Sequence, residues 1–260
     1  MNILERIFER KRQTLTERTS NVALSEIKAR CQDSEPTRGF RNALVTSHRT
    51  VSLIAEVKKA SPVKGIIRED FDPVSIAKGY EAAGAQCLSV LTDVEFFQGS
   101  PDYLVQCRSS VGIPLLRKDF TVSEYDIWEA RSLGADAILL IVNGLSKSQL
   151  REFRECGELL GMDVLVEAHS LDQAELAIET GSTFLGINNR DLETFKESLG
   201  AACSVIPLVK DRATVVSESA IATLDDVRTV SNAGARAVLI GTTFCKAPDP
   251  GAKVKEVMGW

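Results

Sequence analysis

The sequence has no apolar run of the roughly 18 residues that a membrane-spanning helix needs. Its first twenty residues, MNILERIFERKRQTLTERTS, carry charges at helical spacing and lack the apolar core of a secretory signal. The sequence also has no excess of basic over acidic residues. With 36 acidic and 31 basic residues the net charge is −5, whereas a nucleic-acid-binding protein usually presents a basic face. We therefore expect a cytoplasmic protein with neither a membrane nor a nucleic-acid partner.

Cysteine and histidine are too scattered to build a disulfide framework or a metal site. The six cysteines occur singly, without a C-x-x-C pair, and neither His48 nor His169 stands near them in the sequence. Isolated cysteines are typical of reduced thiols in the cytosol. A G-x-S-x-G motif, the sign of a nucleophilic serine, is absent as well.

What the sequence does contain, from Val51 onward, is an alternation of short apolar runs with helical patterns, eight times over. Runs such as CLSVLT and DAILLIV are apolar on both faces, which is typical of parallel strands covered by helices. The first 50 residues lack such runs. They predict short helices at about 2–18, 22–31 and 37–47.

A repeat of about 50 residues favours a closed barrel over an open sheet. Segments beginning at residues 83, 133, 180 and 233 each place a helix-ending glycine just before a buried strand. Two strand–helix units per repeat and eight units in all fit a (β/α)₈ TIM barrel. Because no low-complexity linker interrupts the chain, we expect one domain over residues 1–260, with a helical extension at 1–48 and the barrel at 50–260.

Charged side chains stand at the predicted carboxyl ends of alternate strands, where barrels of this type carry their chemistry. The set comprises Glu56, Lys58, Lys118, Glu167 and Glu218 from odd-numbered strands, with Asn188 and Arg190 from the sixth. Strand side chains alternate between faces, so the set points into the barrel, whereas Lys59 and Arg117 point outward. One such charge is often only the first solvated position of a loop. Desolvating a whole ring costs several kcal/mol per unpaired ion, which indicates a functional site.

The loops after the last two strands predict a phosphate site. Ser219 and Ala220 follow the seventh strand, and Gly241 and Thr242 follow the eighth, where backbone N–H groups commonly hold phosphate in this fold. His169 shares the predicted face of Glu167, but a single histidine more often supports a site than catalyses its reaction.

Eight motifs in order resemble the indole-3-glycerol phosphate synthase family of tryptophan biosynthesis. They are IAEVKKASPVKG (54–65), SVLTDVEFFQGS (89–100), PLLRKDF (114–120), ADAILLI (135–141), VLVEAHS (164–170), GINNRDL (186–192), VSESAI (216–221) and IGTTF (240–244). The resemblance implies a barrel with a helical extension and no metal or organic cofactor. It also implies closure of 1-(2-carboxyphenylamino)-1-deoxyribulose 5-phosphate to indole-3-glycerol phosphate, with loss of carbon dioxide and water. The partner would be this phosphorylated small molecule, and we expect a monomer or weak oligomer.

The resemblance also implies a role for each matching residue. The catalytic residues would be Glu56, Lys58, Lys118, Glu167, Asn188 and Glu218. The substrate would contact Ser61, Phe96, Phe120, Arg190 and Ser219, and its phosphate would lie on Ala220, Gly241 and Thr242. Lys118 would be the acid at the carbonyl and Glu167 the leading carboxylate for proton transfer, while the step at which each lysine acts stays open.

Two positions depart from the family pattern. Ala220 stands where the family usually has glycine, and Asn143 where it usually has a small residue. Two alternatives remain open: another phosphate-sugar barrel such as phosphoribosylanthranilate isomerase, or a barrel without catalysis. An isomerase needs one acid–base pair and would not require two inward lysines with three glutamates, so we favour the synthase. We also expect the N-terminal helices to cover the barrel mouth and assist binding.

Overall fold

Eight parallel strands form a closed barrel in this computed structural model, which describes residues 2–191 and 196–260. The strands are β1 (Ser52–Val57), β4 (Cys87–Leu91), β5 (Leu115–Lys118), β6 (Ala137–Ile141), β7 (Asp163–Ala168), β8 (Phe184–Asn188), β9 (Thr214–Glu218) and β10 (Ala237–Ile240). Each strand pairs with its neighbours in chain order, and β1 closes the ring by pairing with β10. The predicted (β/α)₈ barrel is confirmed. Leu192, the last residue of the 186–192 motif, lies outside the described residues.

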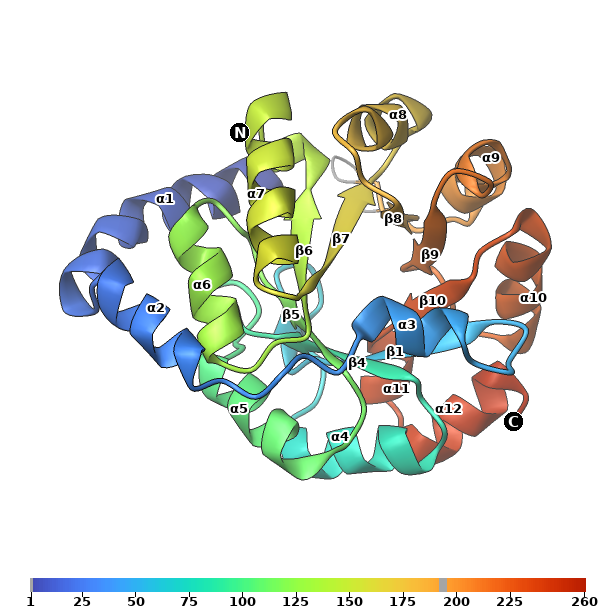
Figure 1. The fold of residues 1–260 in the computed structure, drawn as a ribbon. Coiled ribbons are helices and arrows are strands. Elements are labelled where there is room, and N and C mark those ends of the chain that lie inside the picture. The colour runs from blue at the N-terminus through green and yellow to red at the C-terminus, as the bar shows by residue number, and fades with distance from the viewer. Residues whose placement is uncertain (1, 192–195) are drawn as a thin grey trace.

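Helices surround the strands on the outside (Figure 1). The outer helices are α4 (Pro73–Ala82), α5 (Pro101–Ser110), α6 (Glu124–Ser132), α7 (Lys147–Leu159), α8 (Leu171–Glu179), α9 (Gly200–Val209), α10 (Leu224–Ala233), α11 (Thr242–Cys245) and α12 (Pro250–Met258). A 3₁₀ turn, η1 (Val142–Gly144), follows β6, and a small hairpin of β2 (Ala60–Ser61) and β3 (Gly65–Ile66) follows β1. The four repeat glycines all have positive φ, between +85° and +111°, as the sequence pattern predicts.

The N-terminal extension forms three helices close to those predicted: α1 (Ile3–Asn21), α2 (Leu24–Gln32) and α3 (Phe40–Val45). Asn2 caps α1 by accepting a hydrogen bond from the backbone N–H of Glu5, which satisfies one free donor of the first turn. Helix α2 lies beside α6 (Figure 1). Helix α3 packs at the amino ends of the strands, where the ring of Phe40 lies 6.3 Å from that of Phe184.

Helix α1 reaches the opposite end of the barrel, at the carboxyl ends of the strands. Its residues Ile3, Leu4 and Ile7 line a cavity there, and the Phe8 ring meets the edge of Phe120 at a centroid distance of 5.8 Å. The expectation that the extension covers the mouth is therefore confirmed for α1 and not for α2 or α3. Within the described residues, no helix is both long and apolar enough to pass through a membrane.

Candidate active site

The cavity at the mouth has a volume of about 720 Å³. Side chains alternate along each strand, so Leu116, Leu165 and Val216 are fully buried inside the barrel beneath the charged positions. Every site residue expected from the sequence lines the cavity except Phe96. The outward prediction for Arg117 also holds, because its guanidinium reaches Glu129 on α6.

Lys118, at the end of β5, bridges two carboxylates on the floor of the cavity. Its Nζ lies 2.8 Å from Glu167 Oε2 and 3.1 Å from Glu218 Oε2. Burial opposes the lysine charge, but Glu167, Glu218 and Glu56 together raise the pKa of Lys118 above its usual range. Lys118 is therefore held as an ammonium at neutral pH, with a proton that it can donate to an oxygen that becomes basic during a reaction.

Lys58 and Glu56, two residues apart at the end of β1, form a second buried pair, with 2.6 Å between Lys58 Nζ and Glu56 Oε1. Burial opposes ionisation of Glu56, but Lys58 and Lys118 hold the pKa of this carboxyl below its usual range. Gly241 packs against the same carboxylate, and a Cβ at residue 241 would overlap it. Glycine at this position therefore leaves room for the Glu56 carboxylate.

The charges on the floor do not balance, because three carboxyl groups face two lysines. Burial and the neighbouring charge of Glu167 raise the pKa of Glu218. Glu218 Oε1 has no hydrogen-bond partner among the described residues, and Gly186 gives it space, since a Cβ there would overlap this oxygen. For Glu167, by contrast, burial is outweighed by Lys118 and the pKa is lowered. These opposite directions favour protonation of Glu218 and ionisation of Glu167.

Asn188 and Arg190 extend the site beyond β8. The Asn188 side chain donates to Glu167 Oε1 at 3.1 Å, which orients that carboxylate from the side opposite Lys118. The Arg190 guanidinium is held by Glu197, with Nε 3.0 Å from Glu197 Oε1. Lys64, from the β2–β3 hairpin, also reaches Glu197 Oε1, at 3.4 Å. Lys64 and Glu197, neither of which the sequence pattern placed in the site, both line the cavity.

The loop after β9 has an unusual backbone. Ser219 and Ala220 have φ values of +66° and +61°, in the left-handed region that favours glycine. Both residues line the cavity, together with Gly241, which follows β10, and Thr242, the first residue of α11. Backbone that lines the cavity at this point can approach an anion closely, as the sequence prediction of a phosphate site requires.

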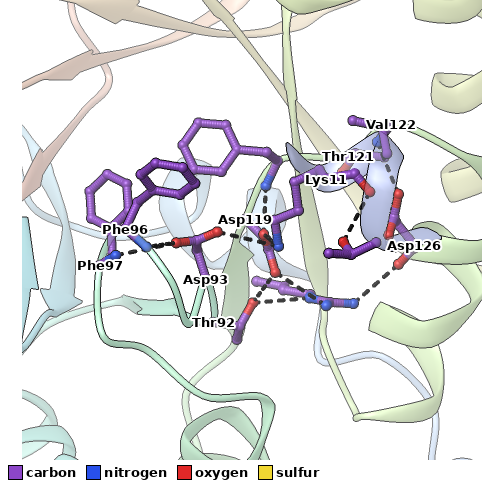
Figure 2. A network of polar contacts seen from close by, with 12 residues as sticks. Lys11, Thr92, Asp93, Phe96, Phe97, Asp119, Thr121, Val122 and Asp126 are labelled. Carbon is purple, nitrogen blue, oxygen red and sulfur yellow. Dashed lines mark hydrogen bonds and ion pairs between the residues drawn. The ribbon is translucent and has the colours of Figure 1, made fainter. Parts of the chain in front are cut away.

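An aromatic wall closes another side of the cavity, and here one expectation was wrong. Phe97 lines the cavity, whereas Phe96 does not. The backbone N–H groups of both residues donate to Asp93 (Figure 2). The Phe97 ring packs 5.9 Å from the ring of Phe120. The sequence contains two adjacent phenylalanines in an irregular loop, where strand parity does not decide which one turns inward.

His169 and Asn143 lie outside the cavity. His169 Nε2 is 3.4 Å from Glu167 Oε1, so the histidine contacts this carboxylate from outside the cavity. Burial lowers the pKa of His169. The Asn143 side chain is exposed and accepts a hydrogen bond from Gln173 at 2.8 Å. Its departure from the family pattern therefore leaves the walls of the cavity unchanged.

Comparisons with known proteins agree with this geometry. A family model described as indole-3-glycerol phosphate synthase matches residues 4–257, which include all eight sequence motifs. Among solved structures, thiamine phosphate pyrophosphorylase from Pyrococcus furiosus is similar with a TM-score of 0.61 and 13% sequence identity, over 81% of this chain and 95% of that chain. At such low identity the likeness to that structure shows the barrel fold alone.

Proposed function

The chain belongs to the indole-3-glycerol phosphate synthase family, and from that premise we propose how its cavity carries out the reaction. As a carboxy-lyase of this family, it closes 1-(2-carboxyphenylamino)-1-deoxyribulose 5-phosphate to indole-3-glycerol phosphate, with loss of carbon dioxide and water. The observation that carries the proposal is the buried cluster of Lys118, Glu167 and Glu218, which meets an aromatic wall in one cavity.

The substrate is an aromatic acid at one end and a phosphate at the other, and the cavity has a matching division. Phe97, Phe120 and the apolar side chains of α1 would enclose the ring. The phosphate would lie on the loops after β9 and β10, at Ser219, Ala220, Gly241 and Thr242. Ser61 would contact the ribulose chain, and Arg190 and Lys58 would hold the carboxylate.

Ring closure forms a bond between the ring carbon that bears the carboxylate and the carbonyl carbon of the ribulose. The carbonyl oxygen becomes an alkoxide, which is basic enough to take a proton even from an ammonium with a raised pKa. We assign that proton to Lys118. Carbon dioxide then leaves, and the electron pair of its bond returns to the ring and restores aromaticity.

Dehydration breaks the bond between carbon and the new hydroxyl group and removes a proton from the adjacent CH₂ carbon. Glu167 is ionised and would collect that proton. The hydroxyl needs a proton in order to leave as water, and a lysine of the floor would donate it. Glu56, Asn188 and Glu218 would hold the lysines, the Glu167 carboxylate and the substrate in place.

We further propose that the chain works in the cytoplasm as a monomer or weak oligomer, as one domain over residues 1–260, with no cofactor and no nucleic-acid partner. Six free cysteines and an acidic net charge support this setting. No observation favours phosphoribosylanthranilate isomerase, and a barrel without catalysis would have no use for three carboxyl groups buried around two lysines.

Turnover of the synthetic substrate by the purified protein alone tests this proposal. Formation of the fluorescent indole product, and its loss in Glu167→Gln, is the expected result. Isomerase activity on phosphoribosylanthranilate, or no turnover by a folded wild-type protein, would reject the assignment.

A further inference from the structure

A buried ion cluster ties α1 to the two loops that carry the aromatic wall (Figure 2). Lys11 Nζ lies 2.5 Å from Asp119 Oδ1 and 3.5 Å from Asp93 Oδ2. The three side chains are 16%, 8% and 3% exposed, respectively. A lysine from the N-terminal extension is thus inserted between two aspartates that follow β4 and β5.

Each aspartate fixes the backbone beside one aromatic ring. Asp93 Oδ1 accepts the N–H groups of Phe96 and Phe97, at 2.8 and 3.2 Å. Asp119 Oδ1 accepts the N–H of Phe120 at 2.8 Å. The carboxylates therefore set where the rings of Phe97 and Phe120 stand, and Lys11 contacts both carboxylates at once.

Asp93 depends on Lys11 for compensation of its negative charge. Asp119 has a second cation, since Arg117 Nη2 lies 3.2 Å from Asp119 Oδ2, although Arg117 is shared with Glu129 on α6. The charged groups that face Asp93 are Lys11 from α1 and Asp119 from the end of β5. Without the lysine, Asp93 would be a buried carboxylate beside another negative charge.

We propose that Lys11 is a positioning residue for the synthase reaction, which keeps the two aspartates together so that Phe97 and Phe120 form the wall against the substrate ring. The inference rests on the proposed placement of the substrate. It assigns to one side chain of α1 a role beyond covering the mouth, because the apolar contacts of Ile3, Leu4 and Ile7 cannot compensate buried charge.

Lys11→Met tests the proposal, and Arg10→Met is its matched control. Arg10 is the preceding residue of α1 and pairs with Glu95 of the same loop, but that pair is about half exposed, at 48% and 53%. Ion pairs on the exposed surface contribute little to stability. We expect Lys11→Met to raise KM about tenfold, equivalent to about 1.4 kcal/mol, with kcat changed much less, and Arg10→Met to leave KM within about twofold. Lys11→Arg should restore most of the loss.

Two readouts separate this role from general loosening of the helix. Inhibition by inorganic phosphate should be unchanged in Lys11→Met, because the phosphate loops follow β9 and β10 and do not contact the cluster. The ratio of KM between variant and wild type should increase with pH, because burial and Asp119 raise the pKa of Asp93 and protonation of the unpaired carboxyl relieves its repulsion from Asp119. Adding Asp93→Asn to Lys11→Met should lower KM again and remove the pH dependence, since an amide oxygen still accepts the N–H bonds without charge.

An unchanged KM in folded Lys11→Met, an equal rise in Arg10→Met, or a parallel rise in the phosphate inhibition constant would overturn the inference. If Lys11→Met alone does not fold, the double variant decides. It must fold and bind substrate better than a variant that lacks α1, and failure to do so rejects the role. Wild-type turnover tests the synthase assignment separately, so the two ideas fail by different results.

Discussion

Replacing Ala220 with glycine should make the protein more stable while leaving its kinetics nearly unchanged. Ala220 has φ +61°, a left-handed conformation in which the methyl group of an L-residue is strained. A left-handed conformation costs an L-residue about 1–2 kcal/mol. We expect the loop to keep this backbone with and without substrate, so binding does not relieve the strain and removing it stabilises the fold.

The expected gain is smaller than the strain itself, because glycine also makes the unfolded chain more flexible. That entropy costs about 0.5–1 kcal/mol, which leaves a net stabilisation of about 0.5–1 kcal/mol. For a chain of this size, such a change raises Tm by roughly 1–4 °C. KM and the inhibition constant for inorganic phosphate should each change by less than about twofold.

Thermal unfolding with and without phosphate measures both effects, and Ala222→Gly supplies the control. Ala222 lies in the same loop, lines the same cavity and does not have positive φ, so glycine there should lower stability. A Tm for Ala220→Gly that falls, or that moves as in Ala222→Gly, would refute the reasoning from backbone strain. A large drop in KM would show that the loop adopts its left-handed form only when phosphate is bound.

Three further predictions follow from the cavity. Glu167→Gln and Lys118→Met should each lower kcat more than about tenfold with the far-UV circular dichroism unchanged, and near-normal kcat would remove that residue from the mechanism. Deleting residues 1–21 should raise KM because α1 forms part of the cavity wall, and an unchanged KM would mean that the helix plays no part in binding. Glu218 has a raised pKa in the folded protein, so the fold binds more protons than the unfolded chain above about pH 4.3. Its contribution to stability is therefore full below that pH and is lost as pH rises through the folded pKa, with a slope of at most about 1.4 kcal/mol per pH unit. Urea unfolding at several pH values should show this slope in wild type and not in Glu218→Gln.

The sequence by itself determined the barrel and most of its floor. Strand periodicity is a local property, so Glu56 and Lys58 on one strand had to share a face, and the same parity placed Lys118, Glu167 and Glu218 inward. The helix-ending glycines were equally local, because positive φ depends on the absence of a Cβ. Closure of the barrel then brought the ends of alternate strands together, as the repeat predicted.

Only the tertiary structure decided the features that depend on contacts between distant segments. Parity does not extend into loops, so Phe97 rather than Phe96 turned inward, and Asn143 turned away from the cavity. Nothing local to Lys11 shows that it lies between Asp93 and Asp119, more than 80 residues away, because that contact arises where α1 crosses the mouth. The raised pKa of Glu218 likewise depends on burial and on the summed charges of several strands, which no stretch of sequence contains.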